Sequence, residues 1–169
     1  MNALPPILDA TCGGRMIWWQ KDCKDAIFCD FRKEEHHSVF KGGGPGGVSP
    51  RHIRVAPDVV SDFRHLPFPD NSFHLAVMDP PHLVHVGDTS WTAKAYGKLE
   101  GDWRGMLRDG FAEVMRVLKP FGTLCFKWSE TQVPAGEVWK AIGSTPLFGT
   151  RTGRKAGTIW AVFMKGVPS

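Results

Sequence analysis

The sequence lacks both the cysteine spacing of a metal site and a hydrophobic run long enough to cross a membrane. Its four cysteines, Cys12, Cys23, Cys29 and Cys125, form no CxxC pair and have no matching pair of histidines. Zinc is therefore disfavoured, and buried reduced thiols are expected. No apolar stretch approaches the roughly 20 residues of a membrane span. The chain also opens without the charged and apolar regions of a signal peptide, so we expect a cytoplasmic protein that needs no metal.

There is also little room for more than one domain, and no internal repeat. A chain of 169 residues predicts a single domain over 1–169, without a separate recognition domain. Hydrophobic residues make up 42% and charged residues 22%, which is enough for a core and argues against disorder. The formal net charge of +4 is too mild to decide whether the partner is a polyanion.

Cations gather in one segment near the end of the chain. Residues 150–155 contain Arg151, Arg154 and Lys155, with glycines around them and no acid among them. A solvated turn and a loop that contacts phosphates both fit this composition, so the two interpretations stay open.

Short apolar segments alternate with helical or irregular ones, which predicts an α/β domain with a mostly parallel sheet covered on both faces. Apolar residues spaced as on one helical face predict a helix over 103–118, ended by Lys119-Pro120-Phe121-Gly122. A shorter helix is expected over 137–142. Strands are expected over 6–11, 26–30, 55–60, 73–79, 123–128 and 158–164, with a further one over 146–149.

Two segments are too long and too polar to be simple connections. Residues 33–51 include the run Gly42-Gly43-Gly44-Pro45-Gly46-Gly47, and residues 83–102 follow a pair of prolines. We expect both to be mobile loops, of the kind that often carries substrate recognition.

Acidic residues stand at or just beyond the ends of four expected strands: Asp9, Asp30, Asp62 and Asp79. Ligands of mostly parallel sheets bind outside the carboxyl ends of the strands, so these acids mark an expected ligand site. The first strand runs into a glycine turn at Gly13, where the backbone can approach a ligand closely. The two oxygens of Asp30 suit a ribose diol, although the cap of a turn is an equally open interpretation.

The segments 7–14 and 62–75, together with Asp30, resemble the motifs by which class I methyltransferases bind S-adenosylmethionine (AdoMet). The resemblance implies AdoMet as cofactor and a Rossmann-like, doubly wound fold. It implies that the first turn lines the methionine end, the acid of the second strand takes the ribose hydroxyls, and an acid–aromatic pair holds the adenine. The residues that it assigns to the cofactor are Asp9, Thr11, Gly13, Asp30, Asp62 and Phe63.

The four residues Asp79-Pro80-Pro81-His82 are similar to the [DNS]-P-P-[YFWH] motif of methyltransferases that act on amino groups of nucleic acid bases. The lone pair of such an amine is delocalised into the ring. A carboxylate (Asp79) and a backbone carbonyl (Pro80) accept its two N–H bonds and leave the lone pair facing the methyl group. The prolines, including Pro81, fix the backbone, and His82 supplies a flat ring to stack on a flipped base.

As a whole, the chain resembles small DNA adenine-N6 methyltransferases of phages and prophages. We therefore expect an enzyme that methylates adenine N6, with DNA favoured over RNA and no membrane partner. Either the two loops supply recognition, or a second subunit does, as in a homodimer, or specificity is low. Three alternatives stay open. They are methylation of RNA adenine, guanine or a cytosine amine; methylation of a small molecule or a protein glutamine; and an inactive AdoMet-binding module.

Overall fold

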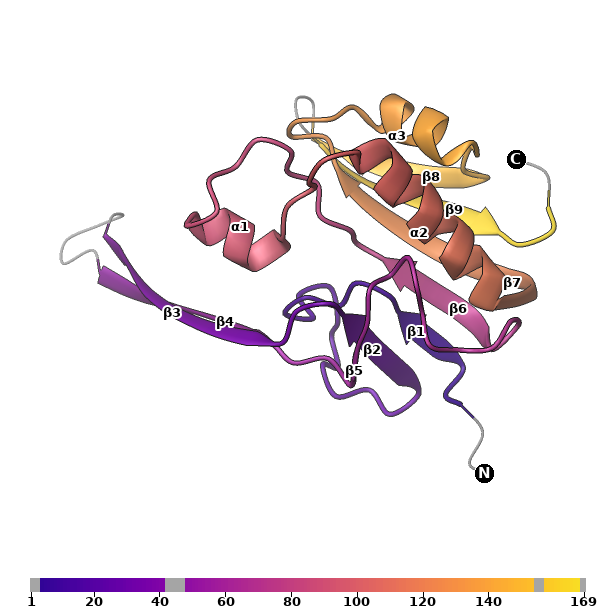
Figure 1. Ribbon diagram of the computed structural model, residues 1–169, viewed down its shortest axis with the longest axis horizontal. Helices are drawn as coiled ribbons and strands as arrows, with labels where there is room; N and C mark the ends of the chain where they lie inside the picture. Colours follow the sequence, from indigo (N-terminus) through magenta and orange to yellow (C-terminus); the bar gives the residue numbers. More distant parts are fainter. Residues whose placement is uncertain (1–3, 42–47, 154–156, 168–169) are drawn as a thin grey trace.

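The computed structural model describes residues 4–41, 48–153 and 157–167. A seven-stranded sheet runs through it in the order β5-β2-β1-β6-β7-β9-β8 (Figure 1). Five neighbouring strands are parallel, and β9 is antiparallel to both β7 and β8. The expected α/β fold with a mostly parallel, Rossmann-like sheet is confirmed. The strands are β1 (Ile7–Asp9), β2 (Ala26–Asp30), β5 (Val59–Val60), β6 (Phe73–Met78), β7 (Leu118–Ser129), β8 (Phe148–Thr152) and β9 (Thr158–Met164).

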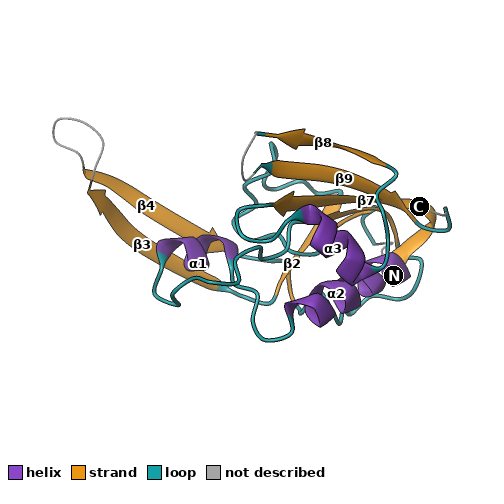
Figure 2. Cartoon of the chain, turned by 90° about the horizontal axis from the view of Figure 1, so that it is seen from above, coloured by secondary structure: helices purple, strands orange, loops and turns teal. Residues whose placement is uncertain are grey.

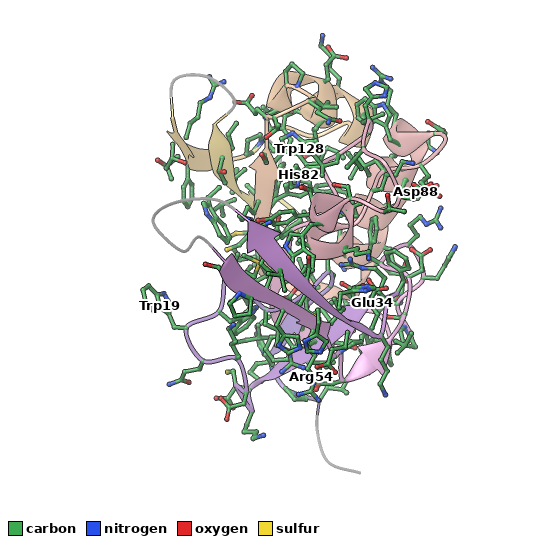
Figure 3. All side chains as sticks on the ribbon, turned by 90° about the vertical axis from the view of Figure 1, so that its left-hand side faces the viewer. Trp19, Glu34, Arg54, His82, Asp88 and Trp128 are labelled. Atoms are coloured by element: carbon green, nitrogen blue, oxygen red, sulfur yellow. The ribbon has the colours of Figure 1, made fainter. Side chains whose placement is uncertain are left out.

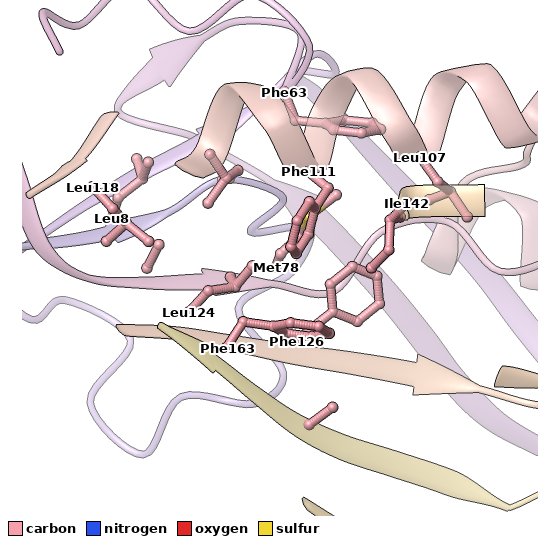
Figure 4. Packing of buried hydrophobic residues seen from close by; sticks show 14 of the residues in the cluster. Leu8, Phe63, Met78, Leu107, Phe111, Leu118, Leu124, Phe126, Ile142 and Phe163 are labelled. Carbon is pink, nitrogen blue, oxygen red and sulfur yellow. The ribbon is translucent and has the colours of Figure 1, made fainter. Parts of the chain in front are cut away.

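Two helices cover one face of this sheet. The helix α2 (Trp103–Val117) begins where the Asp102 carboxylate accepts a hydrogen bond from Gly105 N at 3.0 Å, and α3 (Ala135–Ile142) packs beside it. Their apolar sides meet Leu124, Phe126 and Phe163 of the sheet in the main core (Figure 4). The boundaries of α2 agree with the expected helix over 103–118 to within one residue.

The opposite face is covered differently from expectation. Over β1 and β2 it is closed by the turns of residues 10–25, where the ring of Trp18 meets that of Phe28 edge-on at 4.8 Å. None of the described helices packs on this face, since α2 and α3 lie on the other side and α1 (Trp91–Tyr96) lies beyond the strand ends. Within the described part of the chain, no helix is both long and apolar enough to cross a membrane.

The segment 33–51 is largely a hairpin, so the expectation of an irregular loop is wrong. The strands β3 (Glu34–Lys41) and β4 (Val48–Val55) pair antiparallel, with His37 opposite His52, and project away from the sheet (Figures 1 and 2). A two-stranded ladder satisfies the backbone groups that a long polar loop would leave to water. Since Val55 belongs to β4, only Val59–Val60 of the expected strand over 55–60 joins the sheet.

The segment 83–102 is irregular except for α1, which Ser90 caps by accepting a hydrogen bond from Thr92 N at 3.3 Å. Both views place α1 alongside the base of the hairpin, beyond the carboxyl ends of β1, β2 and β6 (Figures 1 and 2). The fold therefore puts the hairpin, α1 and the acid-bearing strand ends on one side of the molecule.

Candidate active site

Two adjoining cavities lie at the carboxyl ends of the central strands. The first, the Asp62 cavity, has a volume of about 480 Å³ and is lined by Phe31, Asp62 and Pro81 among others. The second, the Asp79 cavity, has a volume of about 260 Å³ and is lined by the turn Thr11–Gly14, the motif residues and Tyr96. Arg32 lines both. Together they have the size usual for small-molecule sites, in the place expected for such a sheet.

The motif Asp79-Pro80-Pro81-His82 forms the inner wall of these cavities. Asp79 directly follows β6, and its backbone N–H donates to Thr11 Oγ1 at 2.7 Å. Pro80 lines the Asp79 cavity and Pro81 the Asp62 cavity, and both are buried. The expected motif residues and Thr11 are thus brought together at one strand end.

Asp79 has an ionic partner that its own motif does not reveal. Lys127, at the end of β7, donates from Nζ to Asp79 Oδ2 at 2.5 Å. Burial raises the pKa of Asp79, and the charge and hydrogen bond of Lys127 act in the opposite direction. The cavity therefore holds a cation–carboxylate pair in which the cation favours the ionised form of the acid.

His82 is half-buried at the entrance to the Asp79 cavity, and its ring lies 5.4 Å from that of Tyr96 and 6.4 Å from that of Trp128 (Figure 3). Burial lowers the pKa of His82, while the nearby carboxylate of Asp79 raises it. A lowered pKa keeps the imidazole uncharged at neutral pH, so His82 offers a flat neutral ring at this entrance.

The glycine turn adopts the expected tight backbone conformation beside the Asp79 cavity, but Asp9 does not line the cavities. Gly13 has φ +48°, a conformation that suits glycine, and its N–H donates to Asp30 Oδ2 at 2.9 Å. Asp9 is fully buried, accepts from Trp18 Nε1 at 2.6 Å and from Thr11 N at 3.1 Å, and lines neither cavity. The Asp9 carboxylate therefore supports the turn from beneath.

The Asp30 carboxylate is hydrogen-bonded by Arg32, a residue that the sequence motifs do not include. Its Oδ1 accepts from the backbone N and the Nε of Arg32 at 2.9 and 3.1 Å. The same guanidinium donates from Nη1 to the carbonyl oxygen of Lys94 in α1 at 3.0 Å. Arg32 therefore ties the end of β2 to α1 across the cavities. Its position two residues after a strand-ending acid was the available signal.

The acid–aromatic pair is rearranged relative to expectation. The Asp62 carboxylate lines its cavity and accepts from Arg64 Nε at 3.0 Å, a bond that lowers its pKa. The ring of Phe63 is only 5% exposed and packs against Gly110 of α2, where a Cβ atom would overlap it. Phe63 is therefore a core side chain that exposes only a small part of its ring to the Asp62 cavity. The exposed ring in the Asp62 cavity is that of Phe31, which is 55% exposed and follows Asp30 directly.

The basic segment 150–155 is only partly described. Arg151 lies on β8 and forms an ion pair with Glu130, so although the segment itself contains no acid, an acid from outside it neutralises this cation. Arg154 and Lys155 lie outside the described residues. Arg151 is not among the residues that line the two cavities.

No protein-family model matches the chain, and no curated protein matches it. Among solved structures, it is similar to a predicted O-methyltransferase, protein Atu636 from Agrobacterium tumefaciens, with 19% identity, 59% of this chain and 39% of that one covered, and a TM-score of 0.37. It is similar to the N-methyltransferase NodS from Bradyrhizobium japonicum WM9, with 15% identity, 66% and 59% coverage, and a TM-score of 0.42.

A third similar structure is the [4+2]-cyclase SpnF, with 14% identity, 64% of this chain and 55% of that one covered, and a TM-score of 0.40. The chain spans less than two thirds of each of these three proteins.

Proposed function

We propose that this protein transfers a methyl group from AdoMet to an exocyclic amine of a nucleic acid base, with adenine N6 in DNA as the favoured target. The observation that carries the proposal is the environment of Asp79. Its carboxylate and the adjoining Pro80 stand in a cavity between the glycine turn and the neutral ring of His82. This combination supplies two fixed hydrogen-bond acceptors and a stacking surface, which is what a weakly nucleophilic aromatic amine requires.

The donor set fits AdoMet. Asp62 and the exposed ring of Phe31 offer an acceptor and a flat surface for the adenine in the Asp62 cavity. Asp30 lines a small hollow beside Phe31 and Asp79, and a ribose hydroxyl would bind its carboxylate by displacing Arg32. The turn at Thr11–Gly13 lines the Asp79 cavity, in which the methionine end would lie beside Asp79. When bound, AdoMet supplies an electrophilic methyl group, and no residue of the chain has to form a covalent intermediate.

Asp79 and Pro80 orient the amine. The carboxylate accepts one N–H of the amine and the Pro80 carbonyl accepts the other, which directs the nitrogen lone pair toward the methyl group. Burial raises the pKa of Asp79, and the charge and hydrogen bond of Lys127 oppose that rise and favour the ionised acceptor. Two prolines in succession hold the carbonyl in a fixed direction because their φ angles are locked.

The test is a methyl-transfer assay with isotope-labelled AdoMet on single-stranded DNA, duplex DNA and RNA, followed by mass spectrometry of the nucleosides. We expect labelled N6-methyladenine, and product reduced by about a hundredfold or more in an Asp79→Asn variant that still binds AdoMet. Methylated cytosine or guanine would instead assign the same chemistry to another base. AdoMet binding without any methylated product would leave a binding module.

A further inference from the structure

A second pair of hollows lies on the other side of α1 from the Asp62 cavity. One, of about 580 Å³, runs between the turn of residues 13–21 and β4, and the other, of about 550 Å³, runs between β4 and α1. They share a wall made of Met16, His52, Ile53 and Ala95. We call this continuous feature the α1–β4 groove.

The groove opens into the Asp79 cavity. Met16 and Ala95 line the Asp79 cavity and both parts of the groove, and Tyr96 lines the cavity and the part beside α1. The ring of Tyr96 also lies 5.4 Å from that of His82, at the end of the motif. A chain molecule lying in the groove would therefore pass beside the Asp79 cavity.

The charge of the groove is one-sided. Arg15, Lys21, Arg51 and Arg54 line it, and among the described residues no aspartate or glutamate does (Figure 3 shows Arg54 on the hairpin). Arg15 is partly neutralised by Asp58 at 3.1 Å. By contrast, the lining of the Asp62 cavity includes four acids: Glu34, Asp62, Asp88 and Glu100. The acid-free groove suits a polyanion, whereas the mixed Asp62 cavity does not.

Flat and apolar side chains alternate with these cations. Trp91 and Tyr96 present rings from α1, His52 presents one from β4, and Met16 is 67% exposed at the shared wall. His52 also forms a hydrogen bond with Glu35 at 2.6 Å, which fixes its ring on the hairpin. Aromatic rings in a basic groove are the features by which proteins hold single-stranded nucleic acid, because rings stack on bases that are not paired.

We propose that the α1–β4 groove binds single-stranded nucleic acid, holding the nucleotides that flank the base whose amine enters the Asp79 cavity. This proposal rests on the proposed function and adds the surface and the strandedness of the substrate. The hairpin and α1 then supply recognition of the nucleotides around the target base, and Arg151 lines neither part of the groove.

The test measures binding of a fluorescently labelled single-stranded DNA of about 12 nucleotides, and of its duplex, over a series of salt concentrations. In Lys21→Ala/Arg54→Ala, the slope of log affinity against log salt on the single strand should become shallower by up to about 1.4, roughly 0.7 for each lost phosphate contact. The matched control, Arg108→Ala/Lys140→Ala, removes two exposed cations from α2 and α3 and should leave the slope unchanged.

A second variant separates stacking from charge. Trp91→Ala should weaken single-strand binding by roughly five- to a hundredfold, as loss of one base–aromatic stack does, and should leave the salt slope as it was. AdoMet affinity should be unchanged in both groove variants. Because α1 has no buried residue, truncation of Trp91 should leave the fold intact, as circular dichroism will check.

Three outcomes overturn the proposal and are distinguishable from one another. If the wild type methylates DNA while both groove variants keep its affinity and salt slope, the groove assignment fails and the proposed function stands. If the wild type binds AdoMet but neither binds nor methylates DNA or RNA, the nucleic-acid part of the proposed function fails with it. Preferential binding of the duplex, unaffected by Trp91→Ala, overturns the single-strand assignment.

Discussion

Lys127 donates a hydrogen bond from Nζ to Asp79 Oδ2 at 2.5 Å, joining the ends of β7 and β6 inside the Asp79 cavity. Met78 of β6 is the register partner of Phe126 of β7. The next residues along the chain, Asp79 and Lys127, are therefore also neighbours, on the opposite face of the sheet from Met78 and Phe126. Lys127 is thus the only ion-pair partner of the partly buried Asp79 carboxylate among the described residues. Lys127 therefore favours the ionised, accepting form of Asp79 against the effect of its burial.

Replacing Lys127 by methionine should therefore lower methyl transfer and move its pH dependence. Burial already raises the pKa of Asp79, and removal of the cation raises it further. Since the ionised form exists above the pKa, the acidic limb of the rate profile should shift to higher pH, and activity should be recovered in part at alkaline pH. Lys127→Arg, which keeps the charge, is the control. An unmoved acidic limb in the methionine variant would show that Asp79 does not titrate in the reaction.

Asp79→Ala should reduce turnover by on the order of 10²–10³, the usual loss for one activating hydrogen-bond partner. AdoMet affinity should stay within a few-fold, because Asp79 acts on the amine. Single-turnover kinetics and calorimetry measure the two quantities separately. Turnover near that of the wild type in this variant would remove the central proposal.

Asp30→Ala should act on the cofactor instead, weakening AdoMet binding by roughly 1.5–3 kcal/mol, the range for a hydrogen bond to a charged group. Arg32→Ala is the informative comparison, because Arg32 occupies Asp30 Oδ1 through two hydrogen bonds. If the ribose takes that oxygen, Arg32→Ala should keep or raise AdoMet affinity. Calorimetry that finds equal losses in both variants would place the ribose elsewhere.

Asp9 should leave a signature in stability rather than in binding. Its pKa is raised from 3.8 to about 7 by full burial, against the hydrogen bond from Trp18. The folded state thus binds a proton that the unfolded chain releases at lower pH, so this contribution to stability is full below about 4 and is lost as pH rises through about 7. Asp9→Asn should flatten the pH dependence of the free energy of unfolding across this window, as measured by denaturant titration. A curve parallel to that of the wild type would contradict the burial of a protonated Asp9.

The sequence allowed the sheet and the strand-end acids to be predicted, because both depend on local patterns. Apolar runs predict the bounds of β2 and β9 to the residue, and the motif at Asp79 marks the end of β6. The hairpin was missed because its glycine-rich connection dominates the composition of residues 33–51, whereas its strands are stabilised by pairing with each other. The contacts Lys127–Asp79 and Phe63–Gly110 depend on register and helix packing, which no local pattern contains.

His82 provides the last prediction, which separates stacking from proton transfer. Burial lowers its pKa, so the ring is neutral at neutral pH and cannot serve as a cation there. His82→Phe should keep methyl transfer within a few-fold of the wild type, because a phenyl ring fits beside Tyr96 and stacks at least as well as an imidazole. His82→Ala should instead raise KM for the nucleic acid by roughly five- to a hundredfold, the cost of one lost base–aromatic stack, with a smaller effect on AdoMet affinity. A hundredfold loss of kcat in the phenylalanine variant, with KM unchanged, would identify the imidazole as a hydrogen-bonding group that the reaction needs.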